Sequence, residues 1–255
     1  MTTRSETDVH WNDRAVKERE VVHVNIADIN QRELEFEAIR PFLNPEMEVL
    51  EVGCGNGYST DRFRAQVRHV DAFDYAENMI AAALERYGES NNRFFKDDVL
   101  DPVHWRDRYD TVICIRVLIN LRNLDEQKQA ITNMLEVLRP GGRFILVEGY
   151  REGFEALTEV RVQCGLAPVQ PARINFYSSQ ADLLPAIETQ CTLEEKFHLG
   201  AYDYLTRIVY PLITPPEEVT HNTSFSEKAA VLARAFNDDC FSRFSRLHGL
   251  IFTKM

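Results

Sequence analysis

Five short apolar runs alternate with segments of helical pattern between residues 47 and 149. The first run is MEVLEV at 47–52, and the last is RFILVEG at 143–149. Strands that are buried on both faces of a parallel sheet read as continuous apolar runs, and helical crossovers join them. The pattern therefore predicts an α/β fold with a Rossmann-like, doubly wound, mostly parallel sheet and helices on both faces, whose core is residues 43–149.

The segments on either side of this core are interpreted as its coverings. Apolar residues at helical spacing predict one helix over 20–42, and residues 1–42 are interpreted as an N-terminal helical lid. Residues 150–255 are interpreted as the C-terminal part of the same domain, with an insertion that covers the open edge of the core and with closing strands.

Local patterns predict four further elements. A long helix over 124–142 would end at a pair of glycines, and the segment 191–210 would contain at least one strand. A second helix is predicted over 226–244, and the apolar LHGLIFTKM at 247–255 is predicted to be a closing strand.

Composition narrows the classes of partner and compartment. The 255-residue chain carries a formal net charge of −11, which argues against nucleic-acid partners because these need a basic surface. No run approaches about 18 apolar residues and no secretory signal pattern is present, so we expect a cytoplasmic protein without a membrane partner. Five cysteines without C-x-x-C spacing fit reduced thiols, and the scattered histidines indicate no metal site. The oligomeric state stays open, and a homodimer is compatible with the sequence.

The most unusual short stretch is VGCGNGY, residues 52–58, which completes the first apolar run. Glycines let a ligand approach the backbone closely, but a tight turn between a strand and a helix needs them as well. The dinucleotide fingerprint G-x-G-x-x-G would place glycine at position 58, where this chain has Tyr58. No G-K-[ST] follows, so the loop is not a P-loop. The loop alone leaves a ligand site and a simple turn both open.

The chain from about 48 to 148 resembles the class I S-adenosylmethionine-dependent methyltransferases, because several motifs follow the order of that family. The first is an acidic residue followed by G-x-G-x-G, and DYAENMIAAA at 74–83 matches the end of the family's second strand. KDDV at 96–99 matches the loop after the third strand, and LRPGG at 138–142 matches the turn into the fifth. The resemblance implies a seven-stranded sheet, S-adenosyl-L-methionine as cofactor and S-adenosyl-L-homocysteine as its product.

The resemblance also assigns residues to parts of the cofactor. Glu51 would support the ammonium group, Asp74 would accept hydrogen bonds from both ribose hydroxyls, and Asp98 would accept one from the adenine amino group. The backbone of Val99 would contact the ring. Taken singly, Asp74 is equally interpreted as a helix cap and Asp98 as a turn residue. The cofactor-binding candidates are Glu51, Gly53, Gly55, Gly57, Asp74, the adenine-lining Tyr75 and Met79, Asp98 and Val99.

The loop after the fourth apolar run is the acceptor-side wall in this family. Arg116 and Asn120 stand there within IRVLINL, and with His23 they are the candidate catalytic residues. Arg116 is costly in an apolar run unless it is paired, so it either binds the acceptor or pairs with a structural carboxylate. Many relatives have histidine where Asn120 stands, so a general base is absent at that position. His198 and His248 are alternative bases, interpreted more simply as structural residues.

Two further segments and two aromatic residues add candidate contacts. A polar stripe at Asn25, Asp28 and Arg32 is interpreted as a solvated helix face, or alternatively as the face of a lid that meets donor or acceptor. Tyr58 and Trp11 are candidate aromatic partners of the sulfonium. Strand patterning explains the tyrosines of YDYLTRIVYP equally well as a binding role does. The candidate substrate-binding residues are Arg116, Tyr150, Arg151, Tyr204 and Arg207.

These features favour an S-adenosylmethionine-dependent methyltransferase that acts on a polar small-molecule acceptor at oxygen. The acceptor classes that suit an aromatic, arginine-bearing pocket are sugars, phosphorylated metabolites and carboxylated intermediates. Transfer to the nitrogen of a small amine is the alternative among enzymes, because it needs no base. A catalytically silent, methyltransferase-like binding protein is the alternative outside enzymes.

Overall fold

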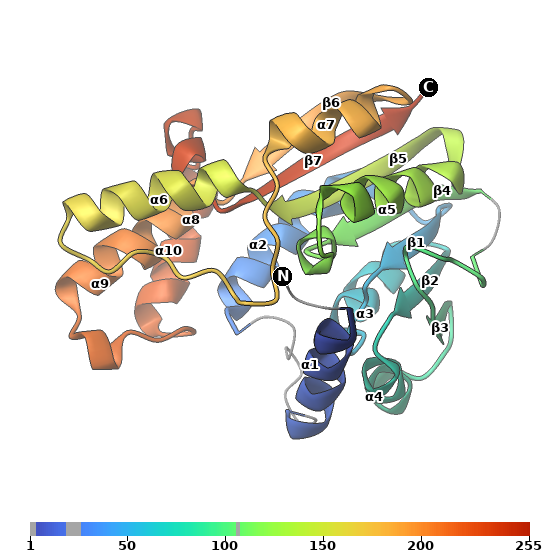
Figure 1. Ribbon diagram of the computed structural model, residues 1–255, viewed down its shortest axis with the longest axis horizontal. Coiled ribbons are helices and arrows are strands. Elements are labelled where there is room, and N and C mark those ends of the chain that lie inside the picture. Colours follow the sequence, from blue (N-terminus) through green and yellow to red (C-terminus); the bar gives the residue numbers. More distant parts are fainter. Residues whose placement is uncertain (1–3, 19–26, 106–107) are drawn as a thin grey trace.

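The computed structural model describes residues 4–18, 27–105 and 108–255 (Figure 1). In this part of the chain seven strands form one sheet in the order β3-β2-β1-β4-β5-β7-β6. The first five in this order pair in parallel, and β7 runs antiparallel between β5 and β6. The strands are β1 (Glu48–Val52), β2 (His69–Asp74), β3 (Asn92–Lys96), β4 (Tyr109–Ile115), β5 (Leu138–Gly149), β6 (Cys191–His198) and β7 (Leu247–Lys254). The predicted mostly parallel, seven-stranded sheet is confirmed.

Helices cover both faces of the sheet because alternate residues of its strands face opposite sides. Leu50 and Val52 of β1 belong to a core that includes α5 and α7, whereas Val49 belongs to a second core with α2, α3 and α4. The helices of the two layers are α2 (Ile29–Ile39), α3 (Tyr58–Arg64), α4 (Glu77–Tyr87), α5 (Leu124–Glu136) and α7 (Gln180–Glu188). Each strand thus contributes to two apolar cores.

The C-terminal helices gather at one end of the sheet, beside α2 (Figure 1). They are α6 (Arg151–Gln163), α8 (Gly200–Tyr204), α9 (Tyr210–Ile213) and α10 (Ser224–Ala235), with a 3-10 turn, η5 (Asp239–Phe244). A separate apolar cluster joins Leu34 of α2 to Tyr202 of α8 and to Ala229 and Ala230 of α10. The N-terminal α1 (Arg4–Lys17) packs elsewhere, against α4.

Two of the predicted helices are shorter than their sequence patterns suggested. The segment 20–42 contains α2 and a 3-10 turn at Arg40–Phe42 that includes Pro41, while residues 20–26 lie outside the described chain. The segment 124–142 ends as a helix at Glu136, and LRPGG is already the start of β5. Leu138 pairs there with β4, so sheet pairing overrides the helical pattern.

Two C-terminal predictions were also wrong in part. The helix predicted over 226–244 stops at Ala235, and a 3-10 turn follows. The alternating YDYLTRIVYP segment is helical, with a π-helical turn, η3, at Leu205–Val209 between α8 and α9. Both edges of β7 are already occupied by β5 and β6, so this segment packs against the C-terminal helices instead of joining that strand. The strand prediction for the preceding residues is confirmed by β6.

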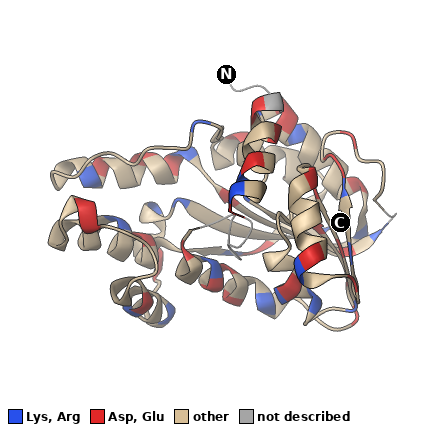
Figure 2. Cartoon of the chain, turned by 90° about the horizontal axis from the view of Figure 1, so that it is seen from below, with Lys and Arg blue, Asp and Glu red and all other residues tan. Residues whose placement is uncertain are grey.

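Charged residues of both signs are interspersed along the helices (Figure 2). Within the described ranges, no helix has the length and apolar character needed to span a membrane. All five cysteines are free, and Cys54, Cys114 and Cys191 are buried.

Gly57 caps α3 with a left-handed backbone, φ 81°, and its missing side chain makes room for α4 and β3. A Cβ there would lie 3.0 Å from atoms of Ala83, Tyr87 and Phe94. Gly57→Ala should therefore lower the free energy of unfolding by about 3 kcal/mol, from left-handed strain and overpacking together. Denaturant titration of the ligand-free protein measures this loss.

Gly165→Ala is the matched control, because Gly165 is also left-handed, with φ 74°, but has open space around its Cβ position. We expect a loss of only about 1 kcal/mol there. Equal losses in the two variants would contradict the packing role of Gly57.

Candidate functional site

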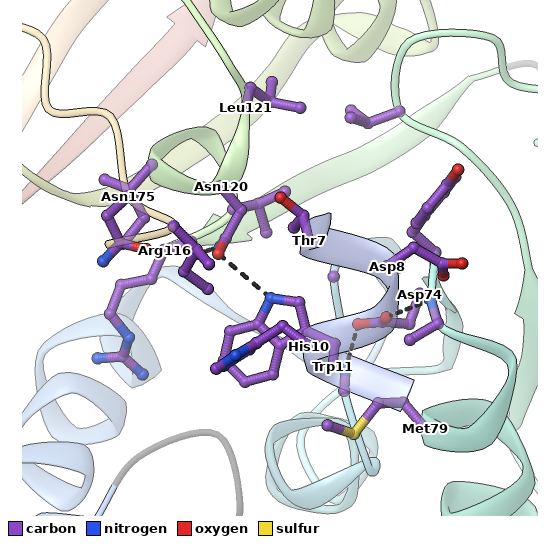
Figure 3. Close-up of a pocket in the computed structure, with 18 of the residues that line it drawn as sticks. Thr7, Asp8, His10, Trp11, Asp74, Met79, Arg116, Asn120, Leu121 and Asn175 are labelled. Carbon is purple, nitrogen blue, oxygen red and sulfur yellow. Dashed lines mark hydrogen bonds between the residues drawn. The ribbon is translucent and has the colours of Figure 1, made fainter. Parts of the chain in front are cut away.

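A cavity of about 370 Å³ opens at the carboxyl ends of β1, β2 and β4. The parallel strands β2 and β4 lie on opposite sides of β1, so the chain crosses over in opposite directions at this point. Such a reversal of strand order leaves a crevice in doubly wound sheets. Helix α1 lies along the cavity, with Asp74 and Met79 on one side and Asn120 and Asn175 on the other (Figure 3).

The glycine loop forms part of the cavity wall through its first two glycines. Gly53 and Gly55 line the cavity, and both have left-handed backbones, with φ 69° and 55°. A Cβ on Gly53 would lie 2.4 Å from Val117 Cγ2, so only glycine lets the β1 loop and the β4 loop meet here. Gly57 does not line the cavity, because its open face is filled by α4 and β3.

Asp74 ties the glycine loop to the start of α4. Its Oδ2 accepts a hydrogen bond from Gly55 N at 2.9 Å, and its Oδ1 accepts one from Ala76 N at 2.8 Å. Burial raises the pKa of this carboxyl to about 6, against the hydrogen bonds that favour its ionised form. The carboxyl lines the cavity, so both its oxygens are held in place beside the open space.

The remaining residues of the predicted cofactor set divide into two groups. Tyr75, Met79, Asp98 and Val99 all line the cavity, and Asp98 Oδ1 accepts a hydrogen bond from Leu100 N at 2.9 Å. Glu51 does not line it: the carboxylate is buried beneath the loop, where it accepts a hydrogen bond from Thr60 Oγ1 at 2.6 Å. Burial raises the pKa of Glu51.

The loop after β4 supplies the opposite wall. Arg116 takes a left-handed backbone, φ 55°, and its Nη1 donates to Glu35 Oε1 at 2.5 Å. The following 3-10 turn, η2 (Leu118–Asn120), sets Asn120 beside it, and Asn120 Nδ2 donates to the Arg116 carbonyl at 2.8 Å. Arg116 pairs with a structural carboxylate, which is one of the two interpretations that its sequence left open, and it also lines the cavity.

Helix α1 contributes residues that the sequence analysis largely missed. Thr7, Asp8, His10 and Trp11 line the cavity (Figure 3), and Arg14 does so one turn later. Trp11 Nε1 donates to Asn120 Oδ1 at 3.2 Å, which joins the helix to the opposite wall. The only signal in the sequence was Trp11 itself, because the segment is charged throughout and has no apolar period.

The polar stripe of α2 is buried, so its interpretation as a solvated face was wrong. Asp28 and Arg32 are 2% and 4% exposed, and Arg32 lines the cavity. Asn25 and His23 lie outside the described residues. Tyr58 stands outside the cavity lining, because its hydroxyl donates to Glu33 at 3.0 Å.

Four of the five predicted substrate-binding residues do not line the cavity. Tyr150 is fully buried in the core, and exposed Arg151 pairs with Asp182. Tyr204 packs on the rings of η5, and Arg207 lies near two carboxylates, Asp28 at the start of α2 and Asp203 of α8. The alternative bases His198 and His248 do not line the cavity either, and burial lowers the pKa of His248 to about 4.

Glu148 supports the acceptor wall from below. It stands near the end of β5, 1% exposed, and its Oε1 accepts a hydrogen bond from Leu118 N at 2.7 Å. Burial raises the pKa of Glu148 to about 8, and its Oε2 has no partner among the described residues. The neutral carboxyl therefore holds the loop that carries Arg116 and Asn120.

The sheet order, the glycine loop and the acidic residue at the end of β2 are those of the class I, Rossmann-like S-adenosylmethionine-dependent methyltransferase fold. Residues 49–142, more than a third of the chain, match the family model described as "Methyltransferase domain". Members of this class take their methyl group from S-adenosyl-L-methionine.

Three relatives illustrate the similarity. Nodulation protein S of Azorhizobium caulinodans is 30% identical over 137 residues, which are 50% of this chain and 65% of that protein. A malonyl-[acyl-carrier protein] O-methyltransferase of Bacillus anthracis is 31% identical over 45% of this chain and 42% of its own length. The chain thus spans less than two thirds of these curated relatives. The N-methyltransferase NodS of Bradyrhizobium japonicum, solved with S-adenosyl-L-homocysteine, shares the fold, with a TM-score of 0.61, 13% identity and 97% coverage of both chains.

Glu148 predicts a pH dependence of stability. Its folded pKa of about 8 lies above the ordinary glutamate value of 4.5, so the unfolded chain releases this proton first as the pH rises. This contribution to stability is full below pH 4.5 and is lost as the pH rises to about 8. Glu148→Gln keeps the acceptor for Leu118 N but cannot ionise. We expect the free energy of unfolding of the variant to rise relative to that of the wild type by up to about 1.4 kcal/mol per pH unit in that window.

Urea titrations at about pH 5, 6.5 and 8 measure this trend. Glu195→Gln, at an exposed position of β6, is the control. Its free energy of unfolding should differ from that of the wild type by the same amount at all three pH values. A constant difference between Glu148→Gln and wild type across the window would contradict the raised pKa.

Proposed function

We propose that this protein transfers the methyl group of S-adenosyl-L-methionine to a polar small-molecule acceptor, at oxygen. The observation that carries the proposal is the cavity itself. Gly53, Gly55, Asp74 and Asp98 line its one half in the order that the family motifs require, and Arg116 lines the other half. Donor and acceptor would therefore share one enclosed space, as an in-line displacement requires.

The donor half has groups for each part of the cofactor. The carboxylate of Asp74 is held at the cavity by hydrogen bonds from Gly55 N and Ala76 N, and it would accept hydrogen bonds from the ribose hydroxyls. Met79 and Tyr75 would flank the adenine, while Asp98 would accept from its amino group and Val99 would contact the ring through its backbone. The glycine loop would receive the amino-acid end, and Arg32 is the guanidinium on that side for its carboxylate.

Glu51 would act through other groups. Because it is buried under the loop, it would support the ammonium end by holding α3 and the loop through Thr60 and by its charge. This is a positioning role. Gly57 would also have a positioning role, since it shapes the loop by packing and does not line the cavity.

The reaction needs alignment, water exclusion and a proton acceptor. The sulfonium is already activated, and its charge disappears in the transition state, so an enclosed pocket favours transfer. Trp11 offers an aromatic face to that charge. His10 lines the cavity with a pKa that burial lowers below 6.5, so its neutral imidazole can accept the proton of a hydroxyl. His10 is thus the candidate base in place of His23, which lies outside the described residues.

The relatives include both an O-methyltransferase and an N-methyltransferase, so similarity alone favours neither atom. The neutral imidazole of His10 favours oxygen, because a free amine needs no base in the protein. N-methylation is the second candidate function. The catalytically silent binding protein is the third, and it would bind the cofactor without turnover.

The division of the chain is also a proposal. Residues 1–42 would act as a lid, since α1 and α2 both line the cavity and α1 is joined to the opposite wall by the hydrogen bond from Trp11 to Asn120. Residues 43–149 would be the cofactor-binding core. Residues 150–255 would complete the same domain, because β6 and β7 extend its sheet, and the loop at 172–175 would cover the acceptor.

Calorimetric titration tests donor binding. The wild-type protein should bind S-adenosyl-L-methionine and S-adenosyl-L-homocysteine at one site, and Asp74→Asn should weaken both by about tenfold or more, through loss of a charge-assisted acceptor. Asp101→Asn, at an exposed position outside the cavity, should bind as wild type. Absence of binding by the folded wild-type protein would exclude the enzyme and the cofactor-binding alternative together.

His10→Gln tests the choice of oxygen. With a hydroxyl acceptor found by transfer of labelled methyl groups, kcat should fall by about 100-fold, while donor affinity stays unchanged. Wild-type kcat/KM should rise with pH through a pKa below 6.5 and level off near neutrality, because only neutral imidazole accepts a proton. A variant that keeps both rate and pH profile would favour transfer to nitrogen.

A further inference from the structure

Two arginines share one buried glutamate at the boundary between the donor and acceptor halves of the cavity. Glu35 Oε1 accepts from Arg116 Nη1 at 2.5 Å, and Glu35 Oε2 accepts from Arg32 Nη1 at 2.8 Å. We propose that the acceptor carries an oxyanion, a carboxylate or a phosphate, which binds the free edge of Arg116. This inference rests on the proposed methyl transfer and names the substrate class for it.

Glu35 carries one negative charge, whereas its two arginine partners carry two positive charges. The side chain is fully buried on α2, and Oε1 also accepts from Gln31 Nε2 at 3.1 Å. One carboxylate can neutralise only one of two guanidinium groups, so the pair keeps an excess positive charge. Burying an uncompensated charge is costly, and a bound anion removes that cost.

The guanidinium of Arg116 has an edge that no described residue occupies. Only Nη1 makes a hydrogen bond to a described residue, and the side chain lines the cavity. The guanidinium therefore keeps Nε and Nη2 as donors. Two N–H groups on one edge of a planar guanidinium match the two oxygens of a carboxylate or phosphate.

The backbone also fixes this side chain. Arg116 N donates to Val147 O at 2.8 Å, and Asn120 Nδ2 holds the Arg116 carbonyl. Asn120 is thus a positioning residue, with its Oδ1 occupied by Trp11. A left-handed backbone at a non-glycine residue is strained, and here it directs the arginine into the cavity wall.

Three other carboxylates line the cavity, those of Asp8, Asp74 and Asp98, and Figure 3 shows Asp8 and Asp74 on the side away from Arg116. Arg122 and Glu126 pair with one another, and Arg14 pairs with Glu18 at 3.4 Å. Glu148 adds no negative charge near neutrality, because burial raises its pKa to about 8.

The bound donor would add a positive charge beside the acceptor. Its carboxylate would pair with Arg32, which leaves Glu35 to Arg116. Its ammonium would interact with Glu51, so the sulfonium is left positive. An anionic acceptor on the free edge of Arg116 balances the sulfonium, whereas a protonated amine would be repelled by it.

Trp11 gives a direct readout, because it lines the cavity and the chain has only one other tryptophan. The protein loaded with S-adenosyl-L-homocysteine is titrated with phenylacetate, phenyl phosphate and the neutral phenylacetamide, and tryptophan fluorescence is recorded. We expect saturable binding of at least one of the two anions and binding about tenfold or more weaker for the amide. Comparison of phenylacetate with phenyl phosphate then distinguishes a carboxylate acceptor from a phosphate.

Variants separate the acceptor role from a structural one. Arg116→Gln should weaken the preferred anion about tenfold or more but change S-adenosyl-L-homocysteine affinity by less than about threefold. Arg116→Lys should recover part of the anion affinity, because it restores the charge without the bidentate edge. The control is Arg143→Gln, in an exposed ion pair with Glu194 on the far part of the sheet. Thermal melts confirm that each variant is folded.

The outcomes discriminate clearly. Equal affinity for the anions and the amide in the wild type would overturn the oxyanion subsite, while intact S-adenosyl-L-homocysteine binding would leave the proposed function standing. Loss of S-adenosyl-L-homocysteine binding in both Arg116 variants would assign this arginine to the donor and overturn the inference as well. Failure of the wild type to bind S-adenosyl-L-homocysteine would reject the proposed function itself.

Discussion

The parallel pairing of β1 with both β2 and β4 is the constraint on which the site depends. The crossovers from these strands must leave in opposite directions, so their loops diverge at the carboxyl edge and leave a space that no side chain of the sheet can fill. Gly53 narrows this space by allowing Val117 to approach, and Asp74 prevents the loop from drifting by holding Gly55. The cavity is therefore a product of topology, and the residues on its edge decide what it can bind.

Charged groups occupy the boundary between α2 and the rest of the molecule. Glu35 contacts Arg116 across it, Asp28 Oδ1 accepts from Tyr202 OH at 2.7 Å, and Arg246 Nη2 donates to Gln31 Oε1 at 3.0 Å. Buried ion pairs contribute little net stability, because desolvation offsets their attraction. Their geometry is specific, however. These pairs therefore determine the position of α2 and add little to the stability of the fold.

The sheet and half of the site could be predicted from the sequence because their signals are local or ordered. Apolar runs mark the strands, and Asp74 ends β2 while Asp98 is the second residue after β3. The partners of charged side chains leave no such signal. Arg32 reads as solvent-exposed until its pairing with Glu35 is seen, and Arg207 reads as a ligand contact until Asp28 and Asp203 are found beside it. Helix α1 was missed because its charges hide the few residues that line the cavity.

Helix α1 and strand β7 have consequences for how this protein is joined to other polypeptides. Thr7 lies on the cavity only one turn into α1, so the described chain begins close to the pocket. Strand β7 runs antiparallel to β5, and Thr253 pairs with Arg143 near the start of the parallel strands. A polypeptide fused after β7 would therefore start at the edge of the sheet opposite the cavity. The C-terminal end can carry a fusion without blocking the site, whereas the start of α1 lies close to it.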